Sequence, residues 1–181
     1  MLMTVVMKDA EDSLPPELAG RLEQLVYADD TLLVARTVPD MQKWLHAVQT
    51  AAAGVGLEMH WGKLQLLRVR CRGNIRTPGG DIVQAPDTLM YLGTSISNDG
   101  RVGGELARRL GIAFAEFRGL QKLWGHTSIS RQRKIELFNA IVVPKLLYSM
   151  SAACLSKAEK RRLDGAHGKM LRGQFVASNI R

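Results

Sequence analysis

The chain has 181 residues, 46% of them hydrophobic, which is enough to bury a core as one domain or two small ones. Its first seven residues are apolar but too few to cross a bilayer, and they lack a basic leader. We therefore expect an intracellular protein, nuclear or cytoplasmic, with no membrane partner and no secretion. Two isolated cysteines suit a reducing compartment and exclude a cysteine-rich zinc site.

The net charge of +8 is spread unevenly along the chain. Residues 1–66 carry five lysines or arginines against nine acids, a balance of −4, whereas the remainder carries twenty against eight, a balance of +12. A basic segment of this strength predicts contact with phosphates, which give affinity that is independent of base sequence and sensitive to salt. Because many basic chains bind nucleic acid only incidentally, the charge supports such a partner without establishing it.

The most informative stretch is LVYADDTLLVA, residues 25–35. Apolar and β-branched residues lie on both sides of Asp29 and Asp30, which predicts two short buried strands joined by a turn that carries the acids. Neighbouring carboxylates repel each other. A hard cation such as Mg²⁺ or Mn²⁺ removes that repulsion, because it takes oxygen ligands and is commonly shared with a substrate phosphate. The alternative is a hairpin turn with two solvated aspartates.

A helix is predicted over residues 41–53, where apolar residues recur at helical spacing. Glycines at positions 54 and 56 are expected to end it. Trp44 lies on the apolar face, so we expect it in the core rather than as a platform on which bases stack. The apolar positions of this helix are Met41, Trp44, Leu45, Val48 and Ala52.

Residues 64–72 alternate apolar residues with three arginines, Arg68, Arg70 and Arg72. A period of two predicts a strand with all three arginines on one face. That face could follow the backbone of a nucleic acid. It could equally protect an edge strand from pairing with other chains, since charged side chains on an edge oppose such pairing.

Turns and strands are predicted in the next segment. Pro78-Gly79-Gly80-Asp81 has the composition of a turn, and so has Asn98-Asp99-Gly100. Between them, residues 81–85 and 88–93 are expected to pair with each other as a hairpin.

Three helices are predicted from residue 103 onward. Arg108 and Arg109 belong to the first, where they are expected to project away from its apolar stripe and to contact nucleic acid. The stripe consists of Leu106, Leu110, Phe114, Phe117, Leu120 and Trp124. Ser130 is expected to cap the second, which Pro144 should kink or break. The third begins with a capping box and has a basic surface, so the three helices suit either a grip on a nucleic acid or a plain bundle. The capping box and the basic residues are Ser156, Glu159, Lys160, Arg161, Arg162, Lys169 and Arg172.

Tyr27-Ala28-Asp29-Asp30 resembles the signature of reverse transcriptases, and its surroundings are similar to those of the non-LTR, LINE-like retrotransposons. In that family the hairpin lies in the palm and supplies part of the two-metal site that joins a deoxynucleotide to a primer end. The resemblance implies that Asp29 and Asp30 are catalytic and bind Mg²⁺ or Mn²⁺, and that Tyr27 contacts nucleic acid. It implies RNA-directed DNA polymerase activity, with an RNA template, a DNA primer and deoxynucleoside triphosphates as partners.

Further segments match the family in the expected order. Residues 56–63 resemble the next block, in which a lysine assists the departing pyrophosphate, so Lys63 is expected to be catalytic, with a solvated lysine as an equal alternative. His60 and Leu64 replace the usual asparagine and threonine. Residues 91–94 resemble the primer-grip hairpin. The residues thereby expected to position the primer end are Tyr91, Leu92 and Gly93.

The resemblance covers nearly the whole chain and implies an α+β fold. Residues 1–100 would form a partial polymerase palm of antiparallel hairpins and packed helices, and residues 101–181 a helical thumb. Met1 to Ala10 looks like the helix that follows the family's Ser-Pro block, and the first metal-binding aspartate of the family lies upstream of it. We therefore expect a two-carboxylate site without its third ligand, with weak Mg²⁺ binding and little or no polymerisation by this segment on its own. The remaining upstream acids are expected to be solvated, namely Asp9, Glu11, Asp12 and Glu17.

The alternative function is a non-catalytic nucleic-acid-binding remnant of a retroelement, folded by its helical part. Salt-dependent affinity for a primer-template without extension would distinguish it from a polymerase. A third possibility is a decaying reading frame that never folds stably, because an incomplete palm sheet leaves an unpaired edge and exposed apolar surface. The sequence leaves the oligomeric state open.

Overall fold

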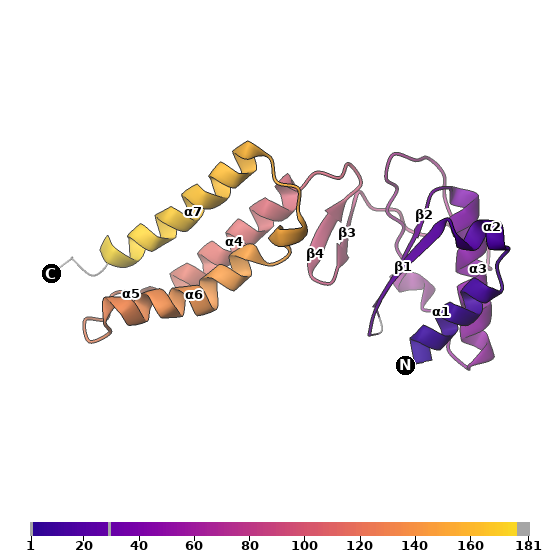
Figure 1. The fold of residues 1–181 in the computed structure, drawn as a ribbon, viewed down its shortest axis with the longest axis horizontal. Coiled ribbons are helices and arrows are strands. Elements are labelled where there is room, and N and C mark those ends of the chain that lie inside the picture. Colours follow the sequence, from indigo (N-terminus) through magenta and orange to yellow (C-terminus); the bar gives the residue numbers. More distant parts are fainter. Residues whose placement is uncertain (1, 29, 177–181) are drawn as a thin grey trace. The chain divides into compact units, whose positions relative to one another are not determined.

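The structure is a computed structural model that describes residues 2–28 and 30–176 (Figure 1). In this part of the chain the fold is α+β, with two hairpins among seven α-helices. None of the described helices is long and apolar enough to cross a membrane. In chain order the elements are α1 (Leu2–Asp12), α2 (Pro16–Ala19), β1 (Leu22–Tyr27), β2 (Asp30–Ala35), α3 (Val38–Gly54), η1 (Trp61–Lys63), β3 (Thr88–Tyr91), β4 (Thr94–Ser97), α4 (Gly103–Gly119), α5 (Gln121–Trp124), α6 (Arg131–Leu147), η2 (Met150–Ala152) and α7 (Lys157–Val176).

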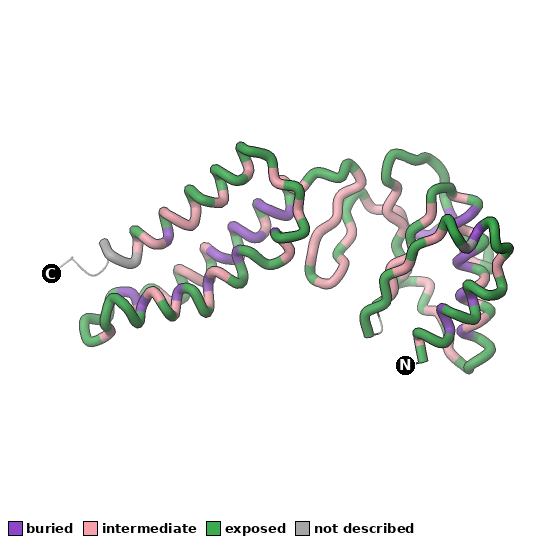
Figure 2. The backbone as a smooth tube through the Cα atoms, viewed as in Figure 1, coloured by how far each residue is buried: buried purple, intermediate pink, exposed green. Residues whose placement is uncertain are grey.

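The chain divides into two compact units. Unit 1 comprises residues 1–93 and 97–100, and unit 2 comprises residues 94–96 and 101–181. Each unit has its own buried apolar residues, which Figure 2 shows in purple.

Strands β1 and β2 of unit 1 form an antiparallel hairpin with Leu25 opposite Leu32 and Tyr27 opposite Asp30. One face of this hairpin packs with α1 and α3 around Trp44. The other face is open: Leu25 is 58% exposed and Tyr27 is 65% exposed. The prediction of two strands is confirmed, but the prediction that both are buried is wrong. The sheet has two strands in the described chain, and alternate side chains point to opposite faces, so one face has no cover.

Helix α3 confirms the helix predicted after the hairpin, although it begins at Val38 rather than at residue 41. The earlier start has a local cause, because the Thr37 side chain accepts a hydrogen bond from the Asp40 N–H and caps the helix. Gly56, at φ +77°, follows its end as predicted. Trp44 is 1% exposed, so the core is confirmed as its place.

The predicted arginine strand is wrong, because residues 64–72 form no strand. Gln65 makes one isolated bridge to Gln84, and Arg70 has φ +53°, a left-handed conformation that ends the alternation of faces. Arg68 is half-buried and donates to the Asn74 side chain at 3.3 Å. Arg70 and Arg72 are exposed, so the segment presents no single row of three arginines.

The predicted pairing of residues 88–93 with residues 81–85 is wrong. Strand β3 pairs with β4 instead. Leu92 and Gly93 have φ +46° and +72°, values that suit a two-residue hairpin turn. Residues 81–85 instead fold back across the confirmed turn at residues 78–81, where the Val83 N–H donates to the Ile75 carbonyl at 3.0 Å. The turn at residues 98–100 is also confirmed.

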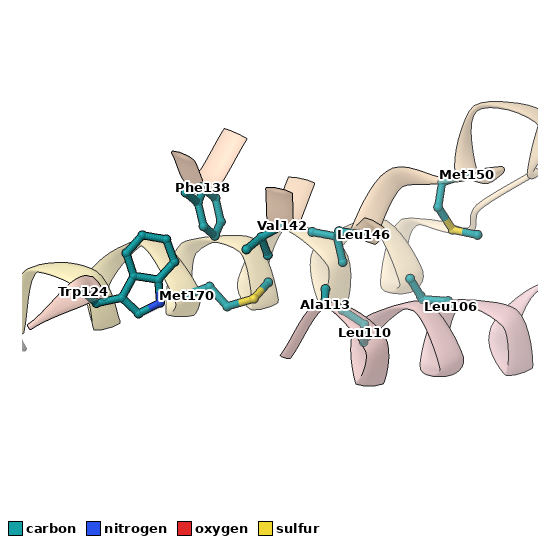
Figure 3. Packing of buried hydrophobic residues seen from close by; sticks show 9 residues of the cluster. All are labelled: Leu106, Leu110, Ala113, Trp124, Phe138, Val142, Leu146, Met150 and Met170. Atoms are coloured by element: carbon teal, nitrogen blue, oxygen red, sulfur yellow. The ribbon is translucent and has the colours of Figure 1, made fainter. Parts of the chain in front are cut away.

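Unit 2 has one apolar core, drawn in Figure 3, to which α4, α5, α6 and α7 contribute. The predicted apolar stripe exists, but helix α4 ends at Gly119. The last residue of the stripe, Trp124, therefore lies in the next helix, α5. The Trp124 indole N–H donates to the Phe117 carbonyl at 2.8 Å, and the two rings stack. The fully enclosed core residues are Leu106, Leu110, Ala113, Trp124, Phe138, Val142, Leu146, Met150 and Met170.

The helix caps of unit 2 were predicted correctly. The Ser130 side chain accepts a hydrogen bond from the Arg133 N–H at the start of α6. Ser156 and Glu159 form the capping box of α7: the Glu159 carboxylate accepts from the Ser156 N–H at 2.8 Å. A break at Pro144 is wrong, because α6 continues through it to Leu147.

Candidate functional site

The β1–β2 hairpin ends in the pair Tyr27 and Asp30. Ala28 in the turn has φ +55°, a left-handed conformation that hairpin turns use. Asp29, one of the two expected metal ligands, lies outside the described residues. Asp30 is exposed at the end of the hairpin. A carboxylate there supplies the oxygen donors that Mg²⁺ and Mn²⁺ prefer.

Tyr91 connects the second hairpin to the first. Its hydroxyl donates a hydrogen bond to the backbone carbonyl of Leu25 at 3.2 Å, across 66 residues of sequence. Leu25 lies on β1, the strand that leads into the turn at Ala28. The residue expected at the primer end therefore touches the strand that precedes the expected metal ligands in the hairpin. Its neighbours in that expectation, Leu92 and Gly93, form the turn between β3 and β4.

Lys63 lies at the end of η1 and is exposed. Partly buried neighbours on both sides, Trp61 and Leu64, pack against the core cluster formed by Leu45, Ile75 and Val83. This packing anchors the backbone at Lys63 while its ammonium group stays in solvent, available to an anion. His60 is exposed and makes no capping hydrogen bond to this helix.

Acidic residues are dispersed in the described part of unit 1. No group of three or more histidine, cysteine, aspartate or glutamate side chains that could hold a metal ion occurs among the described residues. The upstream acids are exposed, as expected for solvated charges; they are Asp9, Glu11, Asp12 and Glu17.

Two arginines of α4 are engaged by one carboxylate. Arg108 binds both oxygens of Glu105, with its Nε and Nη2 at 2.8 Å, and the Arg109 Nε lies 2.6 Å from the same carboxylate. The Arg109 guanidinium also lies 4.3 Å from the centre of the Tyr148 ring. Arg109 is 7% exposed. The expectation that it projects from the surface is therefore wrong, because this side chain lies inside unit 2.

Glu105 is itself buried, at 4% exposure, and accepts a hydrogen bond from the Ser95 N–H of β4 at 3.0 Å. Burial raises the pKa of a carboxyl, but the hydrogen bonds from Arg108, from the Ser95 N–H and from Arg109 outweigh burial and lower the pKa of Glu105 to about 2. Glu105 is thus ionised at neutral pH and holds both arginines and strand β4 on α4.

A basic surface on α7 was indicated by the sequence, but no residue of it was among the predicted nucleic-acid contacts. In the structure its cations are exposed along the helix. The sequence signal that could have placed them in the site is the run of basic residues after the capping box. The apolar residues of the same helix pack in the core, which leaves its basic side chains in solvent. The exposed cations are Lys157, Lys160, Arg161, Arg162, Lys169 and Arg172.

No protein-family model matches the chain, and no solved structure matches it. The chain is 29% identical over 156 residues to an uncharacterised transposon-derived protein of Caenorhabditis elegans. The match covers 83% of this chain and 56% of the relative, so the chain spans about half the length of that protein. The chain is therefore a distant homologue of a transposon-derived protein.

Proposed function

We propose that the chain is part of a reverse transcriptase, an RNA-directed DNA polymerase, from a LINE-like retroelement. The observation that carries the proposal is the hydrogen bond from Tyr91 to Leu25, because it joins the two segments that resemble the family's metal hairpin and primer grip. Homology to a transposon-derived protein supports a mobile-element origin. Residues 1–100 would form part of the palm of this polymerase, and residues 101–181 its thumb.

In the intact enzyme, Asp29 and Asp30 would hold a divalent metal ion beside the primer end. Bound there, Mg²⁺ or Mn²⁺ would orient the attacking oxygen and neutralise phosphate charge. Lys63 would donate a proton to the departing pyrophosphate or orient it. The turn after Tyr91 would position the primer end relative to the hairpin. Positioning and charge neutralisation would supply most of the rate enhancement.

A second candidate function is nucleic-acid binding without catalysis. The exposed cations of α7 favour it, because contacts to phosphate need no metal ion and no acidic residue. The two candidates differ in one observable: both predict salt-sensitive binding of a primer-template, and only the first predicts extension of the primer.

Primer extension by the complete polymerase that contains this chain, with an RNA template and Mg²⁺ or Mn²⁺, tests the proposal. Asp30→Asn should lower extension by about a thousandfold, since metal-ion stabilisation of the transition state is worth several kcal/mol. Asp12→Asn, which alters an exposed acid at the end of α1, is the matched control and should leave extension unchanged. Extension that survives Asp30→Asn would contradict the metal assignment. Binding without extension by the unaltered protein would favour the second candidate.

A further inference from the structure

The hairpin formed by β3 and β4 is closed at its tip and at its base. At the tip, Leu92 and Gly93 make the two-residue turn. At the base, the backbone N–H of Asn98 donates to the Asp87 carbonyl at 2.9 Å, and the Asn98 side-chain amide donates to the Asp87 carboxylate at 2.8 Å. A tight turn at one end and two hydrogen bonds at the other make the hairpin one stiff piece, so its position depends on the groups that hold it.

Each strand of this hairpin makes a hydrogen bond with another part of the chain. The Tyr91 hydroxyl, at the end of β3, donates to the Leu25 carbonyl, and both residues belong to unit 1. On β4, the backbone N–H of Ser95 donates to the Glu105 carboxylate at 3.0 Å, and both residues belong to unit 2. In the sequence, the turn at residues 92–93 therefore lies between two anchors.

The Glu105 carboxylate is itself held in place. Its Oε2 accepts from the Arg108 Nε as well as from the Ser95 N–H, and its Oε1 accepts from the Arg108 Nη2 and the Arg109 Nε. Leu106, the next residue along α4, is fully enclosed in the core of unit 2 and fixes the backbone there. Because both its backbone and its side chain are fixed, Glu105 can fix the position of the strand that it binds.

The stability of unit 2 does not by itself account for this arrangement. A buried ion pair costs the desolvation of both charges, and apolar residues of similar volume often stabilise a core equally well. An apolar side chain could not accept the Ser95 N–H, whereas the charged oxygen of Glu105 accepts it more strongly than a neutral acceptor would. The carboxylate therefore does something for the backbone of β4 that a hydrophobic residue could not do.

We propose that Glu105 is a positioning residue for primer extension: its carboxylate fixes β4 and thereby the turn at Leu92 and Gly93, which would hold the primer end. The inference rests on the proposed function, which supplies the role of the turn. It adds a residue of α4 that acts through the Ser95 backbone and not on the substrate itself. Displacement of reacting groups by about 1 Å can slow a reaction about a hundredfold, so a shifted turn would be felt in the rate.

Two substitutions break this anchor from opposite sides, and both are made in the complete polymerase that contains this chain. Glu105→Gln replaces one carboxylate oxygen by an amide nitrogen, which accepts no hydrogen bond. Ser95→Pro removes the N–H and leaves Glu105 with both arginines; proline is tolerated on an edge strand where the N–H does not pair with the neighbouring strand. Each should lower kcat for extension about tenfold or more. The affinity for a fluorescent primer-template duplex, measured by anisotropy, should stay constant.

Matched controls exist for both substitutions. Glu116→Gln alters a half-buried carboxylate of the same helix that pairs with Lys145 and not with β4, and Ser95→Ala keeps the N–H. Both should leave extension unchanged, and thermal melts show that every variant keeps its fold. The double variant Glu105→Gln with Ser95→Pro should be no slower than either single one, because all three lose the same hydrogen bond. Losses that multiply in the double variant would contradict action through the Ser95 N–H.

Hydrogen exchange of the Ser95 amide in this chain gives a second readout that needs no catalysis. Glu105→Gln should speed this exchange about tenfold, as expected for the loss of a hydrogen bond to a charged group, and Glu116→Gln should leave it unchanged. An unchanged rate in Glu105→Gln would overturn the inference. Extension that survives Glu105→Gln would overturn it and leave the proposed function standing, whereas an unaltered complete polymerase that extends no primer would overturn both.

Discussion

The side-chain amide of Gln42 pairs with the backbone of Arg76 through two hydrogen bonds. Its Nε2 donates to the Arg76 carbonyl at 2.9 Å, and its Oε1 accepts from the Arg76 N–H at 2.7 Å. The Gln42 amide thus pairs with both the N–H and the carbonyl of Arg76, as a neighbouring strand would. These two hydrogen bonds connect the irregular segment after η1 to helix α3. Beneath this pair, Leu45 packs against Ile75 and Val83.

We expect Gln42→Ala to destabilise unit 1 by about 1–2 kcal/mol, because it removes two hydrogen bonds, each worth about 0.5–1.5 kcal/mol. Urea unfolding followed by circular dichroism measures the change. Gln49→Ala on the same helix is the control, since the Gln49 side chain makes no hydrogen bond within the described residues. Equal effects of the two substitutions would show that the Gln42 amide contributes no more than an ordinary helix-surface glutamine.

Glu105 should make unit 2 sensitive to acid. Its pKa is lowered from 4.5 to about 2, so the stabilisation that its ion pairs provide is complete above pH 4.5 and is lost as the pH falls toward 2. The shift corresponds to about 3 kcal/mol. Glu105→Gln is expected to be less stable at pH 7 and to lose less stability between pH 5 and pH 2.5. Glu136→Gln, at an exposed pair on α6, is the control. An identical pH profile for Glu105→Gln and the unaltered chain would contradict the role of this carboxylate.

Trp44 distinguishes a core residue from a base-stacking platform. At 1% exposure it is enclosed by α1 and α3, so we expect Trp44→Ala to lower the stability of unit 1 by about 3–5 kcal/mol. Trp44→Phe keeps most of the volume and should fold, with duplex affinity unchanged. Thermal melts and anisotropy measure the two effects. A loss of affinity in a folded Trp44→Phe variant would indicate that the indole reaches the nucleic acid.

Local signals predicted the helical part of the structure well. Apolar spacing placed Trp44 in the core, and the side chains of Ser130 and Ser156 marked the starts of α6 and α7. These features depend on residues three or four positions apart, which a sequence displays directly. Arg109 shows the limit: it sits three residues after Leu106, on the buried side of α4, where its ion pair with Glu105 helps to make that burial tolerable.

Long-range relationships were beyond the same signals. The alternation around Arg70 suggested a strand, but Arg70 is itself left-handed and interrupts it. Nothing in the local pattern joins Tyr91 to Leu25. The candidate site is therefore predicted as separate segments by resemblance, and only the three-dimensional structure brings two of them into contact.

The hydroxyl of Tyr91 should stabilise the β1–β2 hairpin. Tyr91→Phe keeps the ring but removes the hydrogen bond to the Leu25 carbonyl, whose worth of about 1 kcal/mol corresponds to roughly fivefold faster opening of the hairpin. Hydrogen exchange of the β1 and β2 amides measures that rate. Tyr148→Phe, in unit 2, is the control and should leave hairpin exchange unchanged. In the complete polymerase, Tyr91→Phe should also slow extension, because the hairpin would hold the proposed metal ligands. Equal exchange rates of the β1 and β2 amides in Tyr91→Phe and the unaltered chain would show that this hydrogen bond does not hold the two segments together.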